Sequence, residues 1–161
     1  MTGAPIYRTA RPEDYAPVYA MWMASGGIGV TSREDSQAGF ERFLQRNPAT
    51  CFAATVDGRT VGIILCGNDG RTGHLYHLIV DPVCRGRGIA GKLLKLVLDA
   101  LKADGICGAD AVIFAENPAN DFWEHEGFRS RPDLVYRDIL LDDSNTWQNR
   151  DKRPGDYPGL R

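Results

Sequence analysis

The stretch that decides the fold reads Val80-Asp81-Pro82-Val83-Cys84-Arg85-Gly86-Arg87-Gly88-Ile89-Ala90-Gly91-Lys92. An apolar, strand-like run leads into it, and a helical pattern of apolar residues follows from Ile89 to Ala103. Glycines in such a loop let main-chain N–H groups approach a ligand closely, and the start of the helix adds the positive end of its dipole. Together with Arg85 and Arg87, these features predict an anion site, most simply for phosphate.

Two other phosphate motifs match this loop in part. Gly86-x-Gly88-x-x-Gly91 has the spacing of the dinucleotide fingerprint, but residues 81–85 separate it from the strand and only one strand–helix–strand unit follows. The same residues resemble a P-loop, except that Leu93 stands where Mg²⁺ requires Ser or Thr. A tight turn with glycines for packing is the plain alternative. Nucleotide binding stays a minor hypothesis.

Working outward, the pattern predicts the order β-α-α-β-β-β-α-β-α-β-β. This order is typical of an α/β (α+β) fold with one mixed, mostly antiparallel central sheet of about seven strands and helices on both faces. The expected strands are Ile6–Thr9, Thr50–Val56, Thr60–Cys66, Gly73–Val80, Ala111–Ala115, Phe128–Arg131 and Leu134–Leu141. The expected helices are Tyr15–Ala24, Arg33–Arg46, Ile89–Ala103 and Pro118–Glu126.

Length and charge limit the classes of function. The 161 residues suit one domain, which we expect at 1–141, followed by a polar C-terminal tail at 142–161. A net charge of -2 argues against nucleic-acid binding through bulk charge, and no apolar run approaches the roughly 20 residues of a membrane span. The beginning of the sequence does not resemble a secretory signal.

The four cysteines predict neither a metal site nor a redox pair. No CxxC pattern joins Cys51, Cys66, Cys84 and Cys107. We therefore expect reduced thiols, mostly buried, in a cytoplasmic protein without a bound metal.

Two motifs resemble those of the GNAT superfamily of N-acetyltransferases. Arg85-x-x-Gly88-x-Ala90 after Leu78-Ile79-Val80-Asp81-Pro82 looks like its motif A, and Asn117 with the run Phe122–Phe128 resembles its second motif. The resemblance covers about residues 6–141 and includes the expected order of elements. Residues 67–78 are similar, more softly, to a bacterial YpeA-type subgroup.

The resemblance implies a GNAT-like fold and a binding site for acetyl-CoA. Main-chain groups of Leu78, Ile79 and Val80 would pair with the pantetheine. Asn117 would be a polar anchor, and Trp123 would pack on the CoA chain. The loop and helix start would hold the pyrophosphate through Arg85, Gly86, Arg87, Gly88, Ile89, Ala90 and Gly91.

In this family a primary amine attacks the thioester carbonyl directly, so the enzyme positions the reactants and stabilises the developing oxyanion. The resemblance assigns the oxyanion contact to a main-chain N–H near Val80. His74 stands where the family often has a carboxylate base, so it is the candidate general base; the alternative is an exposed histidine with no catalytic role. Tyr76 would orient the substrate or relay a proton. Strand alternation predicts that His74, Tyr76, Leu78 and Val80 share one face and that His77 lies on the other.

Trp123 occupies the position at which many members carry an acidic tyrosine. An indole only donates a hydrogen bond, so this role is not carried over. Departure of an unassisted thiolate, or help from Tyr76, Tyr136 or water, remains open. The sequence thus predicts an acetyl-CoA-dependent N-acetyltransferase acting on an amine of a small molecule or a protein. The alternative is a non-catalytic acyl-CoA-binding regulatory module. Dimers are common in the family, so a homodimer is an expectation.

Overall fold

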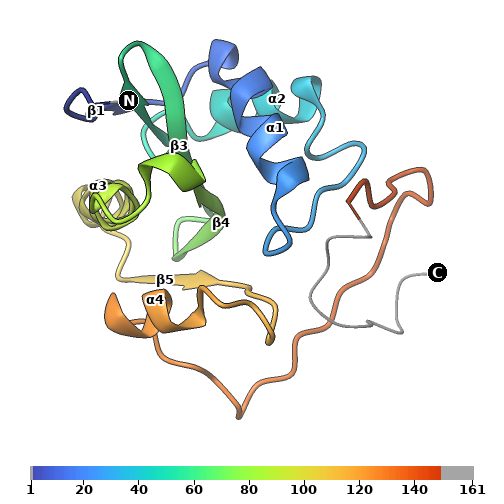
Figure 1. The fold of residues 1–161 in the computed structure, drawn as a ribbon. Coiled ribbons are helices and arrows are strands. Elements are labelled where there is room, and N and C mark those ends of the chain that lie inside the picture. Colours follow the sequence, from blue (N-terminus) through green and yellow to red (C-terminus); the bar gives the residue numbers. More distant parts are fainter. Residues whose placement is uncertain (1, 150–161) are drawn as a thin grey trace.

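A five-stranded sheet organises the part of the chain that the computed structural model describes, residues 2–149 (Figure 1). The strands lie in the order β1-β2-β3-β4-β5; neighbours are antiparallel except for the parallel pair β4–β5. Their bounds are β1 Ile6–Thr9, β2 Phe52–Val56, β3 Arg59–Asn68, β4 Thr72–Val80 and β5 Gly108–Ala111. The helices are α1 Tyr15–Ala24, α2 Gln37–Arg46, α3 Ile89–Ala103 and α4 Asn120–His125, with short 3-10 turns at Pro12–Asp14 and Pro82–Cys84.

Helices cover both faces of the sheet and enclose two apolar cores (Figure 1). The amphipathic helix α3 packs on one face, where Leu93, Leu94 and Val97 are fully buried. On the other face α1 and α2 bury Trp22 and Phe40 against the central strands. The mixed sheet with helices on both faces is the predicted fold class.

The expected number of strands is wrong. The described residues form five strands, because Phe128–Arg131 and Leu134–Leu141 form none. This segment is held at one end where Phe128 packs on Trp123 and at the other where Gln148 pairs with Val30. It therefore runs from α4 towards the loop after α1 rather than beside β5 (Figure 1).

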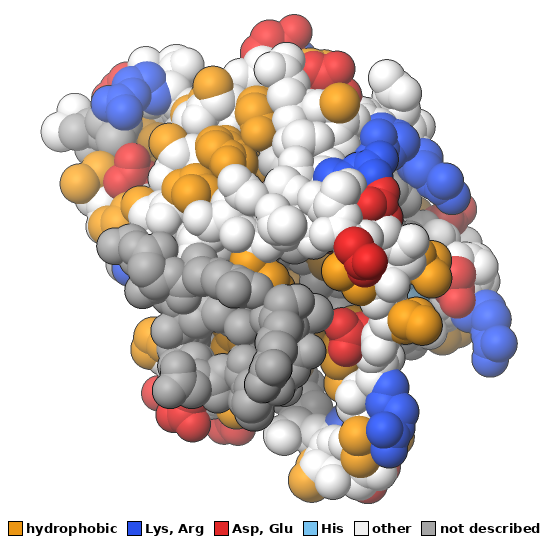
Figure 2. All heavy atoms as spheres, turned by 90° about the vertical axis from the view of Figure 1, so that its right-hand side faces the viewer, with side chains coloured by type: hydrophobic (Ala, Val, Ile, Leu, Met, Phe, Trp, Pro, Cys, Tyr) orange, Lys and Arg blue, Asp and Glu red, His pale blue; other side chains and the backbone are white. Residues whose placement is uncertain are grey.

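Its apolar side chains consequently lie at the surface. Val135, Ile139 and Leu141 are each at least 75% exposed. Figure 2 shows hydrophobic side chains at the surface on the side of the molecule where this segment runs. The strand expected at Ala111–Ala115 is also displaced, to Gly108–Ala111, because pairing with β4 stops at the Leu75–Ala111 pair.

A bulge in β4 reverses its alternation of faces. Leu65 of β3 pairs with Tyr76 and Ile63 pairs with Ile79, so two residues of β4 lie opposite one residue of β3. One of these two, His77, has a φ of 52°, in the left-handed region that few non-glycine residues adopt.

The predicted grouping of side chains on β4 is therefore wrong. Tyr76 contacts Phe43 of α2 and His77 contacts Trp22 of α1, so both face the α1–α2 side. Leu78 and Val80 instead belong to the core on the α3 side. The extra residue in the bulge shifts the two-residue period by one.

Two further expectations concern cysteines and membranes. All four cysteines are free thiols; Cys51, Cys66 and Cys84 are buried, while Cys107 is exposed. Burial raises the pKa of Cys51 to about 11 and that of Cys66 to about 12. None of the helices in residues 2–149 has the length and apolar character needed to cross a membrane.

Candidate active site

The loop between the 3-10 turn and α3 forms an open cradle of main-chain groups. Gly86 and Gly88 both have a φ of 72°, which glycine adopts without strain. A Cβ built on either glycine would meet no heavy atom within 4 Å, so the space above both is open. The first intrahelical bond runs from the Lys92 N–H to the Gly88 carbonyl. The N–H groups at the start of α3 are therefore available to an anion.

A hollow of about 290 Å³ lies at this cradle. Its lining includes Gly86, Gly88, Ile89, Ala90 and Gly91, all predicted from the sequence to bind the cofactor. Two lining residues from α4 and its end, Phe122 and Glu126, were not predicted. The signal for Phe122 was its place in the aromatic run before Gly127, where sequence reasoning chose Trp123 instead.

Glu126 is the acidic residue in the lining of this hollow. A Cβ at Gly91 would lie 3.0 Å from its Oε1 atom, so its carboxylate reaches the first turn of α3. A negative charge there opposes an anionic ligand.

The two arginines of the loop differ in position. Arg85 donates from Nε to the Val80 carbonyl at 3.3 Å and lines the cradle hollow. Arg87 donates from Nη2 to the Gly3 carbonyl at 2.5 Å, so part of its guanidinium is engaged by the N-terminal segment. Of the two arginines, Arg85 is thus the one that contacts the end of β4 and also lines the cradle.

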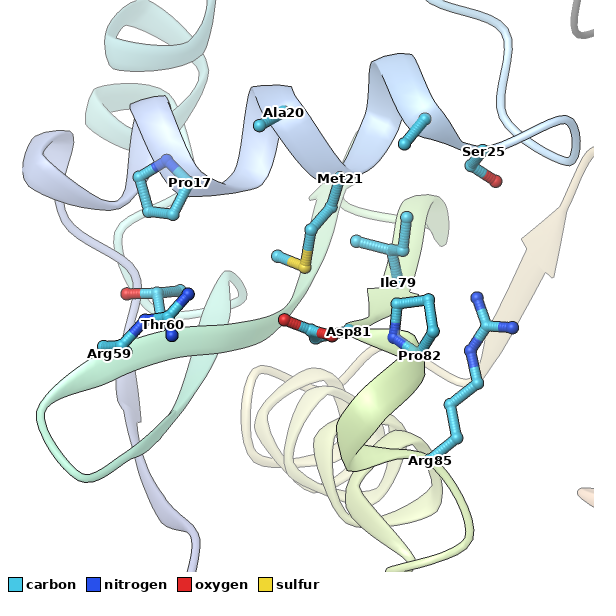
Figure 3. A pocket seen from close by; sticks show the side chains of 11 residues that line it. Pro17, Ala20, Met21, Ser25, Arg59, Thr60, Ile79, Asp81, Pro82 and Arg85 are labelled. Atoms are coloured by element: carbon cyan, nitrogen blue, oxygen red, sulfur yellow. The ribbon is translucent and has the colours of Figure 1, made fainter. Parts of the chain in front are cut away.

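A second hollow, of about 310 Å³, lies on the other side of this point (Figure 3). Figure 3 shows Met21 of α1 pointing towards Asp81, with Ile79 and Pro82 beside them. Arg85 lines this hollow as well as the first. Both hollows therefore border the end of β4: Val80 lines the one at the loop, and Ile79 lines the one at α1.

Strands β4 and β5 separate beside this point. Their parallel pairing covers Thr72–Leu75 and Gly108–Ala111, and β4 continues to Val80. In residues 2–149, the β5-side edge of β4 therefore has no strand beyond Leu75. Leu78 and Val80 direct their main-chain groups to this edge and can pair with an extended ligand such as pantetheine, whereas those of Ile79 face β3.

His74 and Asp110 face each other across the paired part of these strands. The His74 Nδ1 lies 2.9 Å from an oxygen of Asp110, and the two residues are register partners. A carboxylate accepts hydrogen bonds, so this contact favours a proton on Nδ1 and leaves Nε2 able to accept one. The His74 side chain is 40% exposed, which keeps it open to solvent. Sequence reasoning did not select Asp110 as its partner.

Tyr76 is half-buried beside the same pair. Its ring contacts Phe43 edge-on at 5.7 Å between centroids. Burial, with smaller contributions from Asp110 and Tyr136, raises the pKa of its hydroxyl above the ordinary value. Tyr76 is therefore protonated at neutral pH and can donate a hydrogen bond.

Asn117 joins two loops. Its Nδ2 donates to the Gly27 carbonyl at 2.9 Å, and its Oδ1 accepts from the Ala119 N–H at 2.9 Å. Both polar ends of the side chain therefore have protein partners. The predicted anchor residue links the loop after α1 to the start of α4.

Trp123 packs inside the α4 region. Its ring lies edge-on against Phe122 at 5.5 Å and against Phe128 at 5.1 Å. It contacts the core on the α3 side, while Phe122 lines the cradle hollow.

No cluster of three metal-ligating side chains occurs within residues 2–149.

A family model and a curated relative both match this chain to acetyltransferases. The model of the GNAT acetyltransferase domain matches residues 30–141. An acetyltransferase of Sodalis glossinidius is 32% identical over 112 residues, which is 70% of this chain and 78% of that protein.

Solved structures share the fold at lower sequence identity. The PaiA N-acetyltransferase of Thermoplasma acidophilum, solved in complex with coenzyme A, has a TM-score of 0.70 at 17% identity; the match covers 80% of this chain and 91% of that one. A protein of Clostridium acetobutylicum described as a predicted acetyltransferase, solved with acetyl-CoA, has a TM-score of 0.67 at 17% identity; the match covers 84% of this chain and 96% of that one.

Proposed function

The chain belongs to the GNAT family of acetyltransferases, and on that premise we propose that it transfers the acetyl group of acetyl-CoA directly to a primary amine of a small molecule or a protein. The observation that supports this most is the position of the glycine cradle. Gly86 and Gly88 open their main chain to an anion at the end of β4, where no strand of residues 2–149 pairs with the β5-side edge.

In this proposal the cradle holds the pyrophosphate. The N–H groups at the start of α3 bind it with Arg85, and Phe122 closes the hollow from the side of α4. Leu78 and Val80, on either side of Ile79, pair through their main chain with the pantetheine, and an N–H near Val80 faces the thioester oxygen. Acetyl-CoA supplies the activated acyl group, and the protein supplies position and polarity.

His74 is the proposed general base, with Asp110 orienting its ring. His74 precedes the bulge by three residues, or about 10 Å along the strand. A proton from the attacking ammonium therefore reaches Nε2 through water. Tyr76 lies between His74 and the bulge and carries its proton. It orients the acceptor or protonates the departing thiolate.

The wider organisation is also proposed. One acetyltransferase domain occupies 1–141, and the segment 142–161 follows it; we propose a cytoplasmic location on the strength of the four free thiols. A homodimer is proposed from the family resemblance alone. The non-catalytic acyl-CoA module is kept as a second candidate because Trp123, at the position of the family's acidic tyrosine, is packed against Phe128.

The deciding experiment is calorimetric titration of the full chain with acetyl-CoA. The Gly88→Glu variant should lose binding by at least about 100-fold, because a carboxylate would enter the cradle and a side chain is strained at that φ. Gly70→Glu is the matched control, since Gly70 has a φ of 83° and open space but lies in the turn between β3 and β4. Wild-type protein that binds no acetyl-CoA at high micromolar concentration would refute the proposal.

A panel of amines and peptides with mass readout then separates the two candidates. Release of free CoA with an acetylated product supports the enzyme. Tight binding without turnover of any amine supports the regulatory module.

A further inference from the structure

His77 of the sheet is held by side chains from α1 and from the loop before α2. Its Nε2 lies 2.6 Å from Oδ1 of Asp35, which precedes α2. Its ring packs against that of Trp22 with 4.6 Å between centroids. The side chains of His77 and Asp35 are only 17% and 9% exposed. This hydrogen bond is therefore largely shielded from water, where it is stronger than at the surface.

Asp35 holds the loop before α2 with its other oxygen. Oδ2 accepts a hydrogen bond from the Thr31 N–H at 2.7 Å and from the Thr31 hydroxyl at 3.2 Å. The Asp35 carbonyl accepts from the Tyr15 hydroxyl at 3.0 Å. Asp35 is thus fixed at its carboxylate by Thr31 and at its main chain by Tyr15, and it can hold the imidazole in one place.

The backbone at His77 needs such support. A φ of 52° is uncommon for a residue with a Cβ, and neither glycine nor asparagine occupies the position. Such a conformation persists where the surroundings hold it. The bulge starts where β4 leaves β5, and it sets the direction of the main-chain groups of the following residues, 78–80.

We propose that His77 and Asp35 form a latch that keeps β4 bulged, so that main-chain groups of Leu78 and Val80 face the acetyl end of acetyl-CoA. This inference rests on the proposed function. His77 and Asp35 are positioning residues in it: they act through the backbone of β4 and neither accepts a proton from the substrate. The latch also joins the bulge to the loop before α2, which lies on the side opposite the cradle.

The test compares CoA with acetyl-CoA, because the two ligands differ only at the acetyl group. Calorimetry should show wild type binding acetyl-CoA about three- to tenfold more tightly than CoA, the value of one hydrogen bond to the carbonyl. His77→Ala and Asp35→Asn should lose this preference and retain the wild-type affinity for CoA, which depends on the cradle. Thr31→Ala is a milder variant: it removes the hydroxyl bonds to Asp35 at 3.2 Å and to Glu34 at 2.9 Å but keeps the main-chain bond to Asp35, so it should lose only part of the preference.

His77→Gly separates the backbone from the ring. Glycine adopts the positive φ freely but cannot bond to Asp35, so it should retain more of the acetyl preference than alanine does. Equal loss in the glycine and alanine variants would overturn the backbone role.

The remaining outcomes are equally decisive. Full retention of the preference in His77→Ala, or no preference in wild type that binds CoA, would refute the latch. Failure of wild type to bind either ligand would instead refute the proposed function itself.

Discussion

Asn149 should be among the most costly polar side chains to remove from this protein. It is 1% exposed, and its Oδ1 accepts from the Val30 N–H at 3.0 Å while its Nδ2 donates to the Ile28 carbonyl at 2.7 Å. Longer contacts reach the carbonyls of Ser25 and Trp22 at 3.4 and 3.5 Å. The side chain thus satisfies main-chain groups of the loop after α1 that alanine would leave without partners.

The expected loss follows from those two short bonds. A buried group left without a partner costs about 1–3 kcal/mol, so Asn149→Ala should lower the free energy of unfolding by about 2–4 kcal/mol. For a chain of this size each kcal/mol shifts the melting temperature by about 2–4 °C, which predicts a decrease of about 5–15 °C. Asn149→Asp should be at least as damaging, because a carboxylate oxygen would then face the Ile28 carbonyl.

Thermal and urea unfolding followed by circular dichroism measure both quantities. Gln148→Ala is the matched control: Gln148 is exposed and its side chain bonds only to Thr146 of the same segment, so its effect should stay within about 0.5 kcal/mol. A melting temperature for Asn149→Ala within about 2 °C of wild type would show that the loop does not depend on this side chain.

Two further predictions concern the site. His74→Ala should lower the rate with an accepted amine by about 100-fold or more and change the pH–rate profile, with His125→Ala, at an exposed histidine, as the control. An unchanged rate and profile would take His74 out of the mechanism. Glu126→Gln should tighten CoA binding by about two- to fivefold at low salt and less at high salt, because it removes a negative charge from the cradle. Glu124→Gln, outside the lining, should leave CoA binding unchanged. Weaker binding by Glu126→Gln would give the carboxylate a binding role instead.

The cradle could be predicted because its chemistry lies in consecutive residues. Glycines at 86 and 88, an arginine and a helix start define a local geometry whose outcome depends little on the remainder of the chain. The partners of the site could not be predicted in this way. Asp110 meets His74 and Asp35 meets His77 across 36 and 42 positions, and isolated acidic residues carry no signal of where they will lie.

The segment after α4 shows a second limit. Leu134–Leu141 has the composition of a strand, and propensity alone favours one. Its conformation depends on what holds its ends. Trp147 lies against Thr31 and Asn149 is inserted beneath the loop after α1, so the chain is led across the molecule away from β5. A tether of this kind overrides local preference, and no pattern within the segment reports it.

The bulge in β4 explains why the faces of its side chains were predicted wrongly although its two ends were predicted to within one residue. Alternation is a reliable rule only while each residue faces one partner, and a single extra residue reverses every side chain beyond it. The usual signal for a bulge is a glycine or asparagine, and here a histidine occupies the position because its imidazole is bound from another layer. The conformation of β4 at the candidate acetyl site is therefore determined by a contact between the sheet and the loop before α2. For that reason a change in that loop should alter the acetyl end of the site and leave the phosphate end intact.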